Sequence, residues 1–343
     1  MIEHPSIRRE RTNLKKTLEN TRKLQAAGQY PLEFQMPTGI QFELTGACNL
    51  RCKHCYNRSG EADVQTRMKP EDWIALSHHL VENGGVFQCI LSGGEPLLMG
   101  DTLIEIMDIL HEDNTGFLLI SNGLLMTNEW VKKFKKYPFY WIQISIDDSR
   151  REKHDSFRGR EGSWDAATKA AIQISSAGLP LTIAHTITPD NIGRFDEMVE
   201  FAYQLGASTL MCSETLISGR GAKNNELWLN DEQRNLMYTL IEQMQAQWSG
   251  KIRLLYSIPD GIQSEQRQYL PNRSVIIRPN GDVRMDCTMP FTIGNVLEKP
   301  FIEIWREKGA TCWQNPKVRD YIQNILTNNS PDFINHVNTD HHI

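Results

Sequence analysis

The strongest constraint on the fold is a regular alternation of strand-like and helix-like segments between residues 40 and 220. Apolar, β-prone runs are separated by segments with helical periodicity. The runs are residues 40–45, 86–92, 116–121, 141–146, 181–187 and 208–213, and the helical segments are 69–85, 101–111, 127–136, 164–177 and 194–205. Such alternation predicts a parallel α/β sheet, either open or curled towards a barrel, with functional loops at the carboxyl ends of the strands.

The rhythm changes on both sides of this region. The first 35 residues are charged and helix-like up to Gly28 and Pro31. After Gly221 a long helix is expected, then a β-hairpin around Pro279-Asn280-Gly281, then two more helices. We therefore predict four parts: a helical lead-in (1–35), a core barrel (36–222), a smaller C-terminal region (223–328) and a loose polar tail (329–343).

Length and charge exclude several functional classes. A chain of 343 residues can form one large domain, with or without an appendage. The net charge of −5 argues against nucleic acid as a partner, because non-specific binding needs a basic field. No apolar run approaches the ~20 residues that cross a bilayer, and the polar N-terminus has no secretory signal. We expect a cytoplasmic protein.

Three of the seven cysteines lie within eight residues. Cys48, Cys52 and Cys55 form a Cys-x3-Cys-x2-Cys pattern directly after the first predicted strand. An odd and uneven set does not indicate a disulfide framework. Three thiolates on one loop suit an iron–sulfur cluster, and with four irons they leave one iron open. The alternatives are a zinc site completed by His54 or a remote ligand, or three unrelated cysteines.

This arrangement resembles the radical S-adenosylmethionine (SAM) superfamily. Further matches follow in order: SGGEP (92–96), SNG (121–123), ISIDDSRREKHDSFRG (144–159), TITPDN (186–191) and ISGRG (217–221). The long fourth match is similar to the subgroup that modifies peptides and proteins. The resemblance implies an α/β fold, a partial (β/α)6 TIM-like barrel with a small C-terminal α+β appendage of the Twitch type.

The resemblance also implies the cofactors and the residues that hold them. Cys48, Cys52 and Cys55 would hold one [4Fe-4S] cluster, whose open iron chelates SAM. The implied SAM contacts are Gly93, Gly94 and Glu95 for the ammonium group, Ser145 and Arg158 for the carboxylate, Ser121, Asn122 and Asn191 for the ribose or methionine part, and His54 for adenine. Arginine suits the carboxylate because it is always charged and binds it bidentately.

The implied reaction is a reductive cleavage of SAM to a 5′-deoxyadenosyl radical, which removes a hydrogen atom from a peptide or protein. The product would carry a cross-link, an epimerised centre or another change at carbon, as in the maturation of ribosomal peptides. Cys212 at the end of the sixth predicted strand and Cys287 are candidate hydrogen donors. The alternative for both is a packed core cysteine, which is also how we interpret Cys89.

The C-terminal region resembles a SPASM or Twitch extension with few of its ligands. It has the β-hairpin IIRPNGDVRMDC, but residues 268–272 lack the expected upstream cysteine. Beyond Cys287 only Cys312 remains. We therefore predict that this region binds no auxiliary cluster.

Two other functional classes stay open from the sequence. One is a radical SAM enzyme that acts on a small molecule in antibiotic or cofactor biosynthesis. The other is a non-catalytic scaffold that carries zinc or a cluster. For a peptide-modifying enzyme, residues 1–35 are too short for a winged-helix leader-binding domain, so recognition would need either a separate leader-recognition protein or another surface. The expected electron donor is flavodoxin- or ferredoxin-like.

Overall fold

The computed structural model describes residues 4–62, 64–257, 260–328 and 340–343. Its strands form one continuous sheet in the order β11-β10-β9-β8-β1-β2-β3-β4-β5-β6-β7. The seven strands β1 to β7 are parallel neighbours in chain order. Their bounds are Gly39–Glu43, Gln88–Ser92, Gly116–Ser121, Phe139–Ser145, Leu181–Ile187, Thr209–Glu214 and Arg253–Tyr256. The α/β class and the parallel sheet predicted from the sequence are confirmed.

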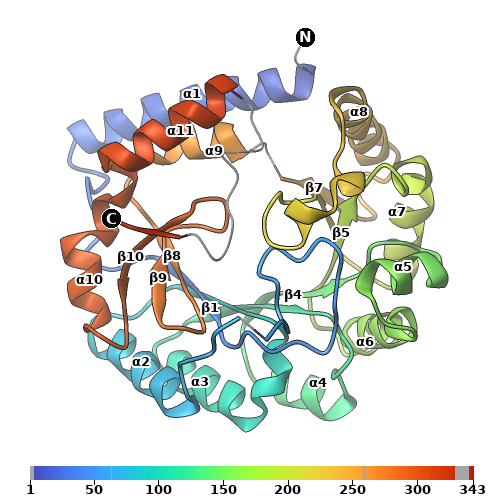
Figure 1. The fold of residues 1–343 in the computed structure, drawn as a ribbon, viewed down its shortest axis with the longest axis horizontal. Coiled ribbons are helices and arrows are strands. Elements are labelled where there is room, and N and C mark those ends of the chain that lie inside the picture. The colour runs from blue at the N-terminus through green and yellow to red at the C-terminus, as the bar shows by residue number, and fades with distance from the viewer. Residues whose placement is uncertain (1–3, 63, 258–259, 329–339) are drawn as a thin grey trace.

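Helices α2 to α8 cover one face of this sheet, which we call the outer face (Figure 1). They are α2 (Pro70–Glu82), α3 (Asp101–Glu112), α4 (Asn128–Phe134), α5 (Arg151–Arg158), α6 (Ser163–Ser176), α7 (Phe195–Gln204) and α8 (Asp231–Gln247). Figure 1 shows them as an arc around the strands. Apolar side chains between the strands and this arc form the core, as expected for parallel strands connected by helices.

Ring contacts with the helices identify which strand residues face outwards. Phe42 of β1 lies 5.0 Å from Trp73 of α2, and His185 of β5 lies 6.2 Å from Phe195 of α7, measured between ring centroids. Because side chains alternate along a strand, Glu43, beside Phe42, points to the opposite, inner face.

The sequence analysis missed two elements of the barrel half. Strand β7 extends the sheet beyond β6, with Cys212 aligned to Tyr256. Its four residues, RLLY, are too short to give a strand signal. Helix α5 is the other omission, because its sequence REKHDSFR is almost entirely polar. The sheet therefore has seven consecutive parallel strands where six were expected, and β7 lies within the predicted C-terminal region (223–328).

The C-terminal region continues the barrel sheet. Strand β8 (Ser274–Ile277) pairs in parallel with β1, and the predicted hairpin joins it to β9 (Asp282–Arg284). Strand β10 (Phe291–Asn295) then pairs antiparallel with β9. The remaining helices are α9 (Asp260–Arg267), α10 (Phe301–Glu307) and α11 (Pro316–Asn328). The predicted domain boundaries remain predictions, although one hydrogen-bonded sheet runs through both halves.

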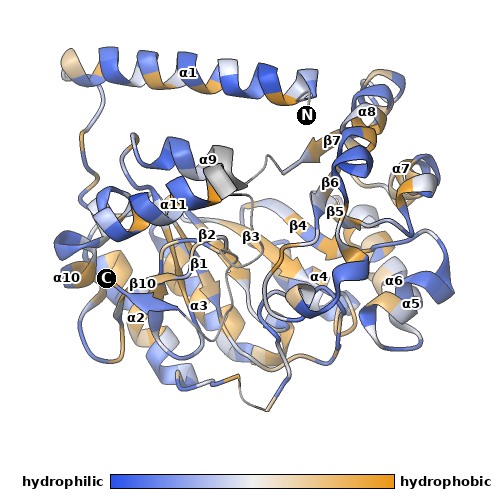
Figure 2. Ribbon diagram, turned by 45° about the horizontal axis from the view of Figure 1, so that its top comes forward, coloured by the Kyte–Doolittle hydropathy of each residue, from blue (hydrophilic) through white to orange (hydrophobic). Residues whose placement is uncertain are grey.

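The lead-in forms helix α1 (Pro5–Ala26), and Figure 2 shows it above the rest of the molecule. His4 Nε2 lies 3.2 Å from Thr239 Oγ1 on α8. At the other end Arg22 lies 5.6 Å from the ring centroid of Tyr269, just beyond α9. The helix therefore links the β7 side of the open sheet to the C-terminal region. None of the described helices has the length and apolar character that a bilayer crossing requires.

Residues 340–343 differ from the predicted loose tail. They contain β11 (His341–His342), which pairs in parallel with β10. The backbone N–H groups of His341 and Ile343 donate to Pro290 O and Thr292 O at 2.7 and 3.0 Å. The rest of the predicted tail, 329–339, lies outside the described residues.

Candidate active site

The loop that carries the cysteine trio follows β1 and lies among the loops of the neighbouring strands (Figure 1). Gly94 N donates to Thr45 O at 2.6 Å, and Arg220 N donates to Cys55 O at 2.9 Å. The loops that meet it include 92–96, 121–123, 147–158 and 217–221. All follow the carboxyl ends of strands, where the α/β fold was expected to gather its functional residues. The structure therefore brings the separate sequence motifs together.

The three cysteines of this loop are free thiols in different degrees of burial. Cys52 is buried, and Cys48 and Cys55 are half-buried. Burial raises the pKa of Cys48 to about 11 and also raises the pKa of Cys52, an increase that Arg158 opposes. Without a bound cation the thiols of Cys48 and Cys52 are protonated at neutral pH. Thiolate formation at this loop therefore requires a positive group, which an iron cluster provides.

Two polar groups approach the cysteine sulfurs. Asn122 Nδ2 lies 3.8 Å from Cys48 Sγ, and Arg158 Nη1 lies 3.6 Å from Cys52 Sγ. Within the described residues no three His, Cys, Asp or Glu side chains converge enough to hold a single metal ion. A four-iron cluster does not need such convergence, because each cysteine binds a different iron. The donor set fits a cluster with N–H groups directed at its sulfurs.

Gly93 and Gly94 make the closest backbone approach at the site. A methyl group on Gly94 would lie 1.9 Å from Ala47 O, and one on Gly93 would lie 2.8 Å from Thr45 O. Gly93 also has a φ of +138°, which L side chains rarely adopt. The group that these glycines approach in this structure is the backbone of the cysteine loop, and their contact with SAM stays a prediction.

Glu95 joins two of the loops. Its buried carboxylate accepts hydrogen bonds from Ser121 Oγ (2.9 Å), Asn122 N (2.9 Å) and Leu97 N (3.2 Å). Burial raises its pKa to about 7, and these donors favour the ionised form. Glu95 and Ser121, both predicted to contact SAM, are thus bonded to each other. Their place in the structure supports a positioning role for both.

The two asparagines predicted to contact SAM also hold protein groups. Asn122 Nδ2 donates to Asn49 Oδ1 at 2.8 Å, which joins the loop after β3 to the cysteine loop. Asn191 donates from Nδ2 to Asp147 O (3.0 Å) and Thr186 O (2.8 Å). Its Oδ1 accepts from Thr188 N at 2.8 Å. Asn191 therefore fixes the loop after β5 to the loop after β4.

Arg158, predicted to bind the SAM carboxylate, already has a carboxylate partner. Its Nε lies 2.5 Å from Asp147 Oδ2, and both side chains are at most 9% exposed. Burial disfavours the Asp147 anion, but the guanidinium outweighs it and holds the pKa of that carboxyl well below its usual range. The same guanidinium reaches Cys52 Sγ. Arg158 is therefore placed to influence the cluster directly.

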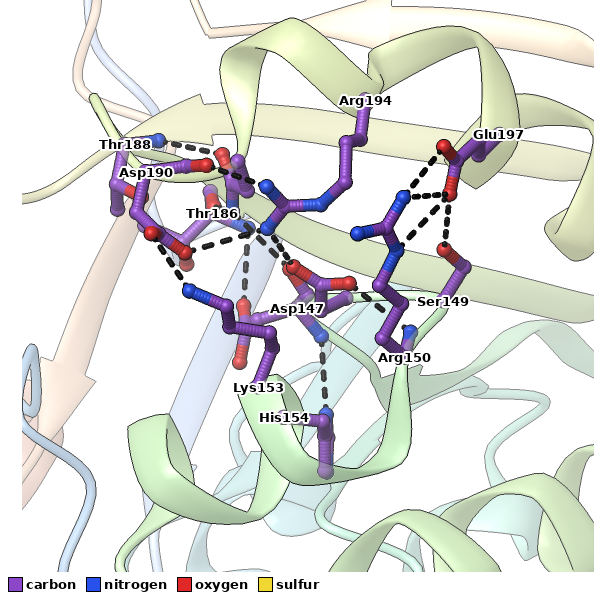
Figure 3. A network of polar contacts seen from close by, with 12 residues as sticks. Asp147, Ser149, Arg150, Lys153, His154, Thr186, Thr188, Asp190, Arg194 and Glu197 are labelled. Atoms are coloured by element: carbon purple, nitrogen blue, oxygen red, sulfur yellow. Dashed lines mark hydrogen bonds and ion pairs between the residues drawn. The ribbon is translucent and has the colours of Figure 1, made fainter.

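The loops after β4 and β5 are held by a polar network, shown in Figure 3. Thr186 N donates to Asp147 Oδ1 at 3.0 Å, and Asp147 N donates to His154 Nδ1 at 3.2 Å. Further out, Lys153 Nζ and Asp190 Oδ1 form an ion pair at 2.8 Å. Residues of α5 are thereby fixed to the β5 loop, and this fixes the direction of Arg158 at the end of α5.

His54 and Ser145 complete the predicted SAM contacts. The His54 ring stacks on Phe157 with 4.6 Å between centroids and 14° between planes. Burial lowers the pKa of His54 to about 4, so the ring is neutral, and its Nδ1 has no partner among the described residues. Ser145 aligns with Ala184 of β5 on the inner face of the sheet. A neutral stacked ring with an unpaired nitrogen is compatible with the predicted adenine contact.

The two candidate hydrogen donors are placed differently. Cys212 aligns with His185, which faces α7, so its fully buried thiol points to the outer core. This register favours the alternative given for Cys212, a packed core cysteine. Cys287 is half-buried beyond β9. Its charge adds to burial and to Glu43 in raising the pKa of Tyr56.

Arg220, in the loop after β6, binds the cysteine loop and was not among the residues predicted from the sequence. Its Nε donates to Cys52 O at 2.7 Å, and its Nη1 pairs with Glu61 at 2.8 Å. Arg220 lies in the ISGRG match, so the motif was visible. Its partners were not, because they lie about 160 residues away in the sequence.

Two family models match the chain. One, described as the radical SAM superfamily, matches residues 42–202, which contain the cysteine trio. Residues 42–202 belong to the radical SAM superfamily. The second model, SPASM, is described as an iron–sulfur cluster-binding domain and matches residues 269–328. The only cysteines in that range are Cys287 and Cys312, so the absence of an auxiliary cluster stays a prediction.

Solved radical SAM structures share the fold. The crystal structure of Streptococcus suis SuiB bound to S-adenosylmethionine superposes with a TM-score of 0.66 at 16% identity, over 94% of this chain and 81% of that chain. The anSMEcpe structure with bound AdoMet gives 0.64 at 16% identity, over 84% and 83%. At such identities the likeness concerns the fold.

Curated relatives are similar in sequence. The Bacillus subtilis subtilosin biosynthesis protein AlbA is 28% identical over 80% of this chain and 60% of its own length. The PqqA peptide cyclase of Granulibacter bethesdensis is 28% identical over 83% and 78%. The mycofactocin maturase MftC of Mycolicibacterium smegmatis is 31% identical over 61% and 53%. The match thus spans less than two thirds of AlbA and MftC.

Replacing Arg158 by glutamine is expected to lower the reduction potential of the cluster. The substitution removes a positive charge and an N–H donor from Cys52 Sγ, and both stabilise the more negative, reduced cluster. We expect a shift on the order of 60 mV, equivalent to a tenfold change for a one-electron couple. A redox titration followed by EPR measures it. Arg151→Gln, an exposed change on the same helix, is the control, and equal potentials for both variants would contradict the assignment.

Proposed function

We propose that this chain is a radical SAM enzyme that modifies a peptide or protein during the maturation of a ribosomally made precursor. The observation that carries the proposal is the contact of four separate strand-end loops with the cysteine loop. The relatives add support, because AlbA, the PqqA cyclase and MftC are named for peptide biosynthesis or maturation. One SuiB structure is bound to its precursor peptide, SuiA.

The residues of the site divide into those that bind and those that position. We assign Cys48, Cys52 and Cys55 to the [4Fe-4S] cluster. When bound, the cluster and SAM supply hydrogen-atom abstraction by one-electron chemistry. We assign Ser145 and the stacked ring of His54, whose Nδ1 has no partner among the described residues, as direct SAM contacts.

The positioning residues act through the residues that bind the cluster and SAM. Glu95, Asn122 and Asn191 hold the loops in place by bonds to backbone and side-chain groups. Arg158 neutralises Asp147 and reaches Cys52. Cys287, which is half-buried beyond β9, is the candidate hydrogen donor that we retain.

A second candidate function is action on a small molecule. The AdoMet-dependent heme synthase of Methanosarcina barkeri is 27% identical over 78% of this chain and 82% of its own length. The Fe-coproporphyrin III synthase of the same organism is 24% identical over 78% and 73%. The match covers these proteins more fully than AlbA, so a tetrapyrrole-like substrate is the specific alternative.

The proposed reaction needs an electron donor, a means of recognising the precursor and a reducing compartment. We place it in the cytoplasm, where free thiols stay reduced. A flavodoxin- or ferredoxin-like protein would deliver the electron. A separate leader-recognition protein would bind the precursor.

Incubation without oxygen tests the proposal. With SAM and dithionite, the purified protein is expected to release 5′-deoxyadenosine, whereas a zinc or cluster scaffold would release none. Co-expression with a precursor peptide encoded beside the gene should then change the peptide mass. Release of deoxyadenosine with turnover of a porphyrin, and an unchanged peptide, would favour the small-molecule function instead.

A further inference from the structure

A cluster of buried charges lies on the inner face of the sheet, beside the cysteine loop. Glu43 at the end of β1 accepts from Tyr56 Oη (2.6 Å) and Asn57 Nδ2 (2.8 Å), both of the cysteine loop. Its other oxygen lies 3.6 Å from Arg278 Nε. Arg284 on β9 aligns with Ile276 of β8, which places it on the same inner face. This group of buried charges therefore extends from the cysteine loop into the C-terminal strands.

The two arginines of this cluster share one carboxylate. Asp340 Oδ2 lies 2.8 Å from Arg278 Nη1 and 3.3 Å from Arg284 Nε. The three side chains are at most 9% exposed. With Asp340 in place, two guanidinium groups face two carboxylates, the second being Glu43. Without it, two buried cations would face a single anion, which is costly in a low-dielectric interior. The two buried arginines therefore require an anion in addition to Glu43.

Asp340 satisfies the pocket only in part. Arg284 is fully buried, yet neither its Nη1 nor its Nη2 has a hydrogen-bond partner among the described residues. Asp340 Oδ1 also has none. A guanidinium can bind a carboxylate through two parallel N–H bonds, and buried donors without acceptors are costly. Arg284 therefore keeps N–H donors that Asp340 does not satisfy, and an occupant with better-placed acceptor atoms would satisfy them.

The segment that carries Asp340 binds as an added strand. Its main-chain bonds to β10 do not depend on its sequence. Asp340 and His342 alternate to the same side, where His342 Nδ1 lies 2.8 Å from Thr292 Oγ1. Strand addition is a common mode of peptide recognition, with main-chain bonds for affinity and side-chain pockets for specificity.

We propose that Arg278 and Arg284 form a subsite for an acidic side chain of an extended peptide, and that residues 340–343 occupy this subsite as an internal competitor. The peptide would pair with β10 in place of β11 and present an aspartate or glutamate to the two arginines. Glu43 connects Arg278 to Tyr56, which follows Cys55, so the anchored peptide would lie beside the cysteine loop. The inference rests on the proposed function only for the peptide nature of the substrate.

Binding of a short probe peptide tests the subsite. The probe is fluorescently labelled Thr-Asp-His-His-Ile, which reproduces residues 339–343, and its partner has Asn for Asp. By fluorescence anisotropy, a holoenzyme variant that ends at residue 339 is expected to bind the Asp peptide about tenfold more tightly than the full chain does. The Asn peptide should bind roughly 10- to 100-fold more weakly, because bonds to charged groups are lost. Arg284→Gln should have the same effect, whereas Arg253→Gln on the exposed end of β7 should have none.

Equal binding of the Asp and Asn peptides, or no effect of Arg284→Gln, would overturn the proposal. If the shortened variant does not fold, Asp340→Ala in the full chain takes its place. Acetate should then raise the Tm of that variant, but not of its double variant with Arg284→Gln, while acetamide and chloride at matched concentration should not. No rescue by acetate would also overturn it. Neither experiment involves SAM cleavage, so its outcome is separate from that of the proposed function.

Discussion

Replacing Gly94 by alanine should destabilise the cysteine loop and lower its iron content. The new methyl group would lie 1.9 Å from Ala47 O and 2.6 Å from its carbonyl carbon. Both are backbone atoms between Thr45 and Cys48, so no side-chain rotation relieves the contact. The loop has to move, at a cost of about 3 kcal/mol or more. Thermal unfolding and iron analysis of protein purified without oxygen measure the two effects.

Gly193→Ala is the matched control for this prediction. Nothing lies within 4 Å of a methyl group at Gly193, and its backbone is not left-handed. It should change the free energy of unfolding by no more than about 0.5 kcal/mol and leave the iron content unchanged. If Gly94→Ala behaved in the same way, the close packing of the glycine loop on the cysteine loop would be wrong.

Replacing Cys52 by alanine should abolish the cluster and the reductive cleavage of SAM. The wild-type protein is expected to hold about four irons per chain, as one [4Fe-4S] cluster requires. The variant removes one of three predicted ligands, and with it the sulfur that Arg158 approaches. We expect loss of the visible charge-transfer absorbance and of 5′-deoxyadenosine formation, each measured on anaerobically reconstituted protein.

Cys212→Ala provides the comparison, because its thiol faces the outer core. This variant should keep its iron, its deoxyadenosine and its product. A loss of product with deoxyadenosine retained would instead restore Cys212 as a hydrogen donor. Roughly eight irons in the wild-type protein would contradict the prediction that the C-terminal region holds no auxiliary cluster.

Much of the fold follows from local patterns. The strand at 181–187 was predicted with the bounds that the structure has, because its β-prone run LTIAHTI lies between Pro180 and Pro189. The hairpin at 274–284 followed from Pro279-Asn280-Gly281, which favours a turn. Strand β7 and helix α5 were missed because a four-residue strand and a polar helix carry little local signal.

The candidate site was predicted as a set of residues but not as a set of contacts. The spacing of the cysteines and the order of the loops sufficed to place Cys48, Cys52, Gly94 and Glu95 near one another. The partners of these residues did not follow from the spacing. Glu95 accepts a hydrogen bond from Ser121, and Arg158 forms an ion pair with Asp147. Glu95, Ser121 and Arg158 were predicted to contact SAM, but in this structure each already has a protein partner.

The sequence by itself determined the parallel α/β architecture and the cysteine loop at the end of its first strand, because periodicity and spacing act between residues close in the chain. Only the tertiary structure decided the direction of Cys212, the pairing of β8 with β1 and the insertion of Asp340 between Arg278 and Arg284. The facing of a strand residue depends on its register, which pairing with distant strands sets. The ion pairs of Asp340 with Arg278 and Arg284 join residues about 60 positions apart, and only the folded structure brings these residues together.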